Sequence, residues 1–165
     1  AVLFKGTVRE NMQWRSKNAD DTHIEKALET AQALSFVKEK PEGLDHMITQ
    51  GGKNLSGGQR QRLTIARALV GDPEILILDD SASALDLATD AALRKALAKA
   101  QEESGMTVFI VSQRVSSIRN TDKIIVLDGG RMAGIGSHDE LLKTCGVYKE
   151  ICMSQLTAEE ANENG

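Results

Sequence analysis

The sequence predicts an α/β fold with a parallel sheet, preceded by a mostly helical lobe. Apolar residues recur at helical spacing before residue 70, the segment Ile75 to Leu78 is apolar throughout, and strand-like and helix-like segments alternate after it. A short, continuously apolar strand is expected where both faces of a parallel sheet are covered. We therefore divide the chain into a helical lobe, residues 1–70, an α/β lobe, residues 71–155, and a polar tail, residues 156–165.

Two helices are predicted in the helical lobe. The first begins at a capping box over residues 22–25, carries apolar residues at helical spacing up to Leu34, and ends before Pro41. The second follows a glycine-containing loop over residues 51–58 and stops before Gly71. Its apolar stripe consists of Leu63, Ala66, Leu69 and Val70.

The α/β lobe is predicted to continue with alternating elements. They are a helix over residues 88–102, a strand over 107–111, a short helix over 114–119 and a strand over 123–127. Asp128-Gly129-Gly130 is typical of a hairpin turn, and a capping box over residues 137–140 opens a last helix. Cys145 and Cys152 are expected on that one helix as packing residues, and the polar tail after it is expected to fray.

Composition excludes several classes of function. Hydrophobic residues make up 41% of the chain, enough for a core, and the net charge of −4 comes without the basic stripe that nucleic-acid binding requires. The chain contains no apolar run near the ~20 residues that span a bilayer, and its first residues do not resemble a signal peptide. A transmembrane partner would therefore lie outside it.

The segment Leu55-Ser56-Gly57-Gly58-Gln59 is the first candidate binding site. Two glycines without side chains lie at a predicted helix start. The free N–H groups of a helix start and the helix dipole favour an anion such as phosphate. The same residues also fit a simple capping box between Ser56 and Gln59, with the glycines serving the loop geometry. The five residues alone leave both interpretations open.

Carboxylates at the end of the first strand form the second candidate. Asp79 and Asp80 follow the apolar segment, where ligand sites of open α/β sheets gather, and a carboxylate there can hold Mg²⁺. The alternative is that the pair only solvates the strand end. Asp86 by itself is most simply a helix N-cap, and Gln113 closes the next strand at a comparable place in the sheet.

The order of these segments closely resembles the nucleotide-binding domain of ATP-binding cassette (ABC) proteins, a P-loop NTPase-like fold, over almost the whole chain. Residues 55–59 resemble the family signature, residues 75–79 its Walker B strand and residues 83–86 its D-loop. The resemblance implies ATP and Mg²⁺ as cofactors, with Asp79 assisting the metal. It also implies that the signature residues Leu55, Ser56, Gly57, Gly58 and Gln59, together with Asp86, contact nucleotide.

Two further segments favour exporters within the family. Residues 3–11 resemble the stretch that follows the Q-loop of exporters, and residues 49–52 resemble their X-loop. Gln50 stands where many exporters carry Glu. The resemblance thus implies a multidrug- or lipid-type exporter of bacterial origin. It would work on the cytoplasmic side of the cell membrane and be coupled to transmembrane helices.

The sequence departs from the family at two catalytic positions. The family places a Glu that activates the attacking water where this chain has Asp80, and a switch His where it has Gln113, whose amide cannot transfer a proton. The signature is complete. This pattern resembles one subunit of heterodimeric bacterial exporters, in which two cassettes sandwich two ATP molecules. The rival interpretations are a non-hydrolytic, ATP-gated dimerisation module and a soluble ABC ATPase acting on nucleic acid or the ribosome.

The phosphate loop of the family is missing from these residues. No G-x-x-x-x-G-K-[ST] segment occurs, so we expect a longer parent protein that carries this loop upstream, and a chain that does not hydrolyse ATP alone. Because the phosphate-loop strand should neighbour the Ile75 to Asp79 strand, we also expect uncovered apolar surface and strand edges here.

Overall fold

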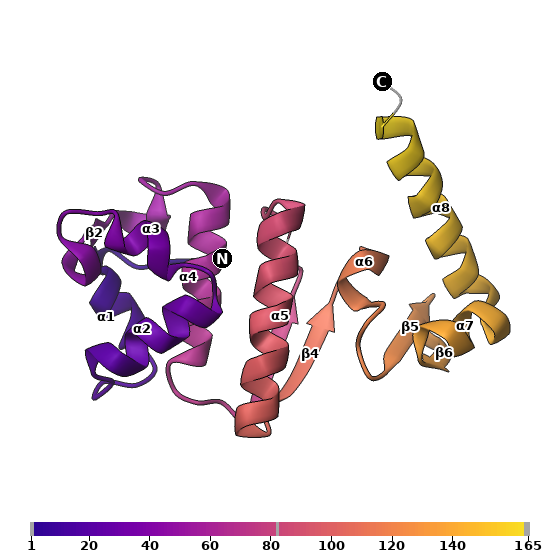
Figure 1. Ribbon diagram of the computed structural model, residues 1–165, viewed down its shortest axis with the longest axis horizontal. Coiled ribbons are helices and arrows are strands. Elements are labelled where there is room, and N and C mark those ends of the chain that lie inside the picture. The colour runs from indigo at the N-terminus through magenta and orange to yellow at the C-terminus, as the bar shows by residue number, and fades with distance from the viewer. Residues whose placement is uncertain (1, 82, 164–165) are drawn as a thin grey trace. The chain divides into compact units, whose positions relative to one another are not determined.

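The computed structural model describes residues 2–81 and 83–163, with side chains described as far as residue 155 (Figure 1). The chain forms two compact units, residues 1–111 and 112–165, which are considered separately. The boundary between the units differs from the predicted lobe boundary at residue 70. The reason is a single core, which joins Leu63 of the helical segment to Leu76 of the first long strand and Leu93 of the helix that follows.

The first unit contains helices α1 to α5 and strands β1 to β4 (Figure 1). The helices are α1 (Val8–Met12), α2 (Asp21–Thr30), α3 (Leu34–Lys38), α4 (Gly57–Leu69) and α5 (Leu87–Ser104). The strands are β1 (Gly6–Thr7), β2 (Met47–Ile48), β3 (Ile75–Asp79) and β4 (Thr107–Val111). Two 3₁₀ turns, η1 (Gly43–Asp45) and η2 (Gln50–Gly52), lie on either side of β2.

The first predicted helix is wrong at both ends. Asp20 rather than Thr22 is the N-cap of α2, since an oxygen of its carboxylate accepts a hydrogen bond from the His23 N–H at 2.9 Å. The helix ends at Thr30, and Gln32 adopts a left-handed conformation with φ of 58°. This turn separates α2 from α3, so the apolar pattern up to Leu34 spans two helices.

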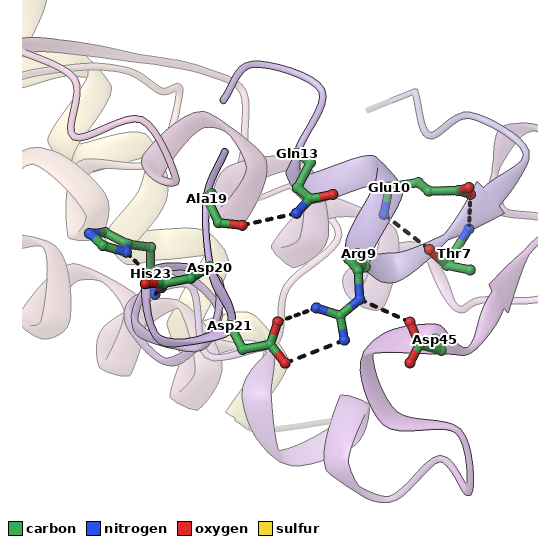
Figure 2. A network of polar contacts seen from close by, with 9 residues as sticks. All are labelled: Thr7, Arg9, Glu10, Gln13, Ala19, Asp20, Asp21, His23 and Asp45. Atoms are coloured by element: carbon green, nitrogen blue, oxygen red, sulfur yellow. Dashed lines mark hydrogen bonds and ion pairs between the residues drawn. The ribbon is translucent and has the colours of Figure 1, made fainter. Parts of the chain in front are cut away.

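A polar network fastens α1 to its neighbours (Figure 2). Thr7 and Glu10 form a capping box that starts α1. The Arg9 guanidinium lies between two carboxylates, with its Nε 2.9 Å from Asp45 of η1 and both terminal nitrogens on Asp21 at the start of α2. These carboxylates raise the pKa of Arg9, first through the hydrogen bond to Asp45. Residues far apart in sequence are thus held together on one side of the lobe.

The parallel sheet of this unit consists of β3 and β4, paired from Ile75 with Thr107 to Asp79 with Val111. Its parallel pairing is as predicted. Leu76 and Leu78 face the core, but Ile75 and Ile77 are 58% and 66% exposed, so the prediction of a strand covered on both faces is wrong for this chain. The core residues of α4 and α5 cover one face only. The expected uncovered apolar surface is therefore present.

The second unit consists of α6 (Val115–Ile118), β5 (Ile124–Asp128), β6 (Arg131–Gly136), α7 (His138–Thr144) and α8 (Gly146–Glu163). The predicted hairpin is confirmed. β5 and β6 pair antiparallel, and Gly129 and Gly130 make the turn with φ of 53° and 75°, which favour glycine. The capping box between Ser137 and Glu140 is also confirmed at the start of α7.

Two predictions for the end of the chain are wrong. Cys145 ends α7 in an extended conformation, whereas Cys152 lies in α8, so the two cysteines are not on one helix. Both are buried in a small core with Leu141 and Tyr148, as expected of packing residues. Instead of fraying after residue 155, the backbone of α8 continues to Glu163. Within the described residues, no helix combines the length and the apolar character needed to cross a bilayer.

Candidate functional site

The segment Ser56 to Gln59 forms the N-terminal turn of α4. The Ser56 hydroxyl accepts a hydrogen bond from the Gln59 N–H at 3.2 Å, and the Gln59 side chain accepts one from the Ser56 N–H at 3.0 Å. The capping-box interpretation is therefore confirmed, and buried Leu55 anchors the turn to the core. A capping box does not exclude an anion. The N–H groups of Gly57 and Gly58 lie in the first turn of α4, where no helical carbonyl precedes them by four residues to accept their hydrogen bonds.

Both glycines pack closely on the 83–86 turn. A Cβ atom at Gly58 would lie 3.1 Å from the carbonyl oxygen of Ala84, and one at Gly57 would lie 3.5 Å from the Cβ of Ala84. Any larger residue at Gly58 would have to displace backbone. The segments that resemble the family signature and the D-loop therefore pack against each other within one chain.

Gln61 joins this turn to the end of β3, and the sequence analysis did not identify it as a site residue. Its side-chain Nε2 donates to the carbonyl oxygen of Asp80 at 3.1 Å, and its Oε1 accepts from the N–H of Ala84 at 3.0 Å. Gln61 is only 8% exposed. The available signal was its place one turn before buried Ile65, on the inward face of α4.

Asp79 is the last residue of β3 and Asp80 follows it, and both side chains are exposed. Asp80 has φ of 45°, a left-handed conformation that Asp tolerates better than most residues. Its N–H donates to Val111 of β4 at 3.1 Å, and its carbonyl oxygen accepts from Gln61 and from the Ser83 hydroxyl. The structure thus links Asp80 to α4 through Gln61, while its carboxylate stays accessible.

The donor chemistry at this strand end suits Mg²⁺, which is commonly bound by one or two carboxylates and substrate phosphates. Asp79 offers an accessible carboxylate there. Among the described residues no cluster of three or more His, Cys, Asp or Glu side chains could hold a metal ion without help.

Asp86 is the N-cap of α5, as its position in the sequence suggested. Its carboxylate accepts from the Thr89 N–H at 2.8 Å and from the Thr89 hydroxyl at 2.7 Å. These bonds, the backbone one first, lower the pKa of Asp86 below its ordinary value. A group with a lowered pKa stabilises the fold above its unfolded-state pKa and loses this effect as the pH falls through its folded-state pKa.

Asp86→Asn is accordingly expected to make acid unfolding less steep. Asn still caps the helix but has no proton to gain, so less stability should be lost between about pH 5 and about pH 2. Urea unfolding of the wild-type protein and of Asp86→Asn across this pH range measures the free energy of unfolding that each loses. Equal losses in the two chains would show that Asp86 does not contribute to acid sensitivity.

Gln113 belongs to the second unit, whereas Asp79, Asp80 and Asp86 belong to the first. Its side chain is exposed. The loop that carries it is fixed by Gln155, which donates to the Gln113 carbonyl oxygen and accepts from the Val115 N–H at 2.8 Å. The backbone of this loop is therefore held from α8, and the Gln113 carboxamide remains available to a ligand.

Arg62 lies on α4 shortly after the signature turn, but its side chain contacts other parts of the fold. It donates to the Gln32 carbonyl oxygen at 2.7 Å and lies over the Phe36 ring at 4.9 Å. Burial lowers its pKa. Arg62 therefore fastens α4 to the turn between α2 and α3 instead of facing a ligand.

Several known proteins of one family resemble this chain in sequence. The family model described as ABC transporter matches residues 1–83. The chain is 43% identical to the probable multidrug resistance ABC transporter ATP-binding/permease protein YheI of Bacillus subtilis, covering 96% of this chain and 27% of that protein. It is 41% identical to the ATP-dependent lipid A-core flippase of Desulfotalea psychrophila, covering 90% of this chain and 26% of that protein.

The fold matches a solved exporter. The structure of a bacterial Atm1-family ABC exporter with ATP bound aligns with a TM-score of 0.88 and 35% identity, over 94% of this chain and 27% of that one. The chain thus spans about a quarter of the length of the proteins it matches. The P-loop NTPase-like fold expected from the sequence is confirmed, and the chain belongs to the ABC transporter family.

Proposed function

We propose that this chain is part of the ATP-binding and ATP-hydrolysing domain of an exporter. The observation that carries the proposal is the contact of Gly58 in the signature turn with Ala84 of the D-loop, in a fold that aligns with an ATP-bound exporter. The domain would work on the cytoplasmic side of a bacterial membrane. It would couple ATP turnover to transmembrane helices that lie outside these 165 residues.

The signature turn is proposed to act on ATP held by a second cassette. Ser56, Gly57, Gly58 and Gln59 would face the partner's nucleotide, where the Gly57 and Gly58 N–H groups and the α4 dipole favour phosphate. Asp86 would lie near the same interface. Since the sequence of this turn matches the family signature in full, we expect it to complete an active site.

The site on this chain's own side is proposed to be slow. Asp79 would hold Mg²⁺, which neutralises phosphate charge when bound. Asp80 would orient the attacking water with a side chain one methylene shorter than Glu, and Gln113 would contact the terminal phosphate without moving a proton. A partner with its own complete Walker motifs is therefore favoured, and a heterodimer over a homodimer.

A titration of Mg-ATP followed by calorimetry tests this division of roles. The 165-residue chain contains no phosphate loop, so alone it should bind no nucleotide. Mixing it with an intact cassette should tighten ATP binding or raise turnover by the cassette. The control is the same mixture with Ser56→Ala in this chain. Micromolar binding by the chain alone, or a mixture no different from the cassette by itself, would contradict the proposal.

A further inference from the structure

Among the described residues around the signature turn, Gln61 is a buried polar side chain that the proposed function does not use. It lies on α4, two residues beyond the signature turn, and is 8% exposed. A buried carboxamide offers a donor end and an acceptor end, and both are engaged here. The donor end holds the Asp80 carbonyl oxygen and the acceptor end holds the Ala84 N–H.

Both contacts fix backbone that would otherwise be weakly held. Asp80 lies in a left-handed conformation after the last paired residue of β3, and Ala84 lies in an irregular turn before α5. The Ser83 hydroxyl belongs to the same hydrogen-bond network. It donates to the Asp80 carbonyl oxygen at 3.1 Å and lies 3.5 Å from Gln61 Nε2. The direction of the Asp80 carboxylate depends on this backbone.

We infer that Gln61 is a positioning residue that fixes the Asp80 backbone and the 83–86 turn relative to the signature turn. Gln61 itself contacts neither nucleotide nor metal in this role. It acts on the strand end and on the turn at once, so the two respond together to any movement of α4. The consequence for catalysis rests on the proposed function, in which Asp80 orients water.

Amide hydrogen exchange in the full-length protein tests the contact directly. Gln61→Met has a similar volume but no hydrogen bonds, so the Ala84 N–H should exchange about tenfold faster or more. Gln61→Glu keeps an acceptor, so Ala84 protection should change less than about twofold. Gln101→Met, the same change on α5 outside the network, is the control. Unchanged Ala84 exchange in Gln61→Met would overturn the inference.

ATP turnover by the full-length protein with its partner cassette tests the consequence. A group that positions without touching nucleotide should affect kcat and not KM, so both Gln61 variants should lower kcat about tenfold with KM for ATP within about twofold. Gln61→Glu is the more decisive variant for the role through Asp80, since its carboxylate cannot donate to the Asp80 carbonyl oxygen. Wild-type kcat in Gln61→Glu would overturn the role through Asp80.

The two measurements separate this inference from the proposed function. If the wild-type protein does not turn over ATP, the proposed function fails, and exchange at Ala84 still decides whether Gln61 positions the turn. If Gln61→Met does not fold, the Gln61→Glu variant decides the inference through its retained Ala84 protection and its lowered kcat.

Discussion

Replacing Asp80 with Glu is expected to raise ATP turnover at this chain's own site by about 10- to 100-fold. A general base typically contributes about 10² to 10⁴ in rate and must come within hydrogen-bond reach of the proton it accepts. Hydrogen bonds with Val111 and Gln61 fix the Asp80 backbone. The backbone therefore cannot shift toward the attacking water to compensate for a short side chain. Under the proposed function, one added methylene would supply the missing reach.

Single-turnover hydrolysis of ATP by the full-length protein with its partner measures this gain. Asp128→Glu, the same lengthening at the end of β5, is the matched control and should leave turnover unchanged. Glu fits the left-handed backbone at Asp80 less well than Asp does, so a slightly lower melting temperature should accompany the higher rate. Turnover that does not rise would show that reach does not limit this site.

The sequence predicted elements best where their ends are encoded locally. Ser56, Asp86 and Ser137 all start helices as expected, because each side chain caps the N–H of the third residue after it. The Gly129-Gly130 turn was equally clear, since its backbone requires positive φ at both residues. Signals of this kind need no knowledge of the rest of the fold.

Prediction failed where two local signals competed or none existed. Thr22 and Glu25 have the form of a capping box, yet Asp20 takes the cap, and the Thr22 pattern falls inside the first turn of α2. Gln32 separates the two helices through its positive φ, and the sequence has no glycine there to indicate such a turn. Neither error concerns the residues that hydrogen-bond around the end of β3, which are Gln61, Asp80 and Ala84.

The site itself was predicted in part. Similarity of sequence motifs indicated residues 55–59 and Asp79, but motifs do not reveal which segments touch. Gln61 escaped notice because its partners, Asp80 and Ala84, lie 19 and 23 residues further along the chain. Likewise, the apolar pattern of β3 indicated a buried strand, whereas burial depends on what covers each face of the sheet.

Ser56→Ala is expected to lower ATP turnover by the assembled protein by about 10²-fold or more, the largest loss we predict. Under the proposed function, Ser56 and the first N–H groups of α4 face the phosphates of the partner's ATP. Removing one fixed donor from such a site typically costs about 10² to 10³ in rate. The change also removes the N-cap of α4, which should cost about 1 kcal/mol of stability.

Ser137→Ala separates these two effects. Ser137 and Glu140 form a capping box at the start of α7 with the same pattern of bonds as Ser56 and Gln59. Both variants should lose a similar free energy of unfolding, measured in urea, while only Ser56→Ala loses ATP turnover. Because the cap is matched, equal turnover in the two variants would mean that Ser56 serves helix α4 alone and that the signature turn does not act on the partner's ATP.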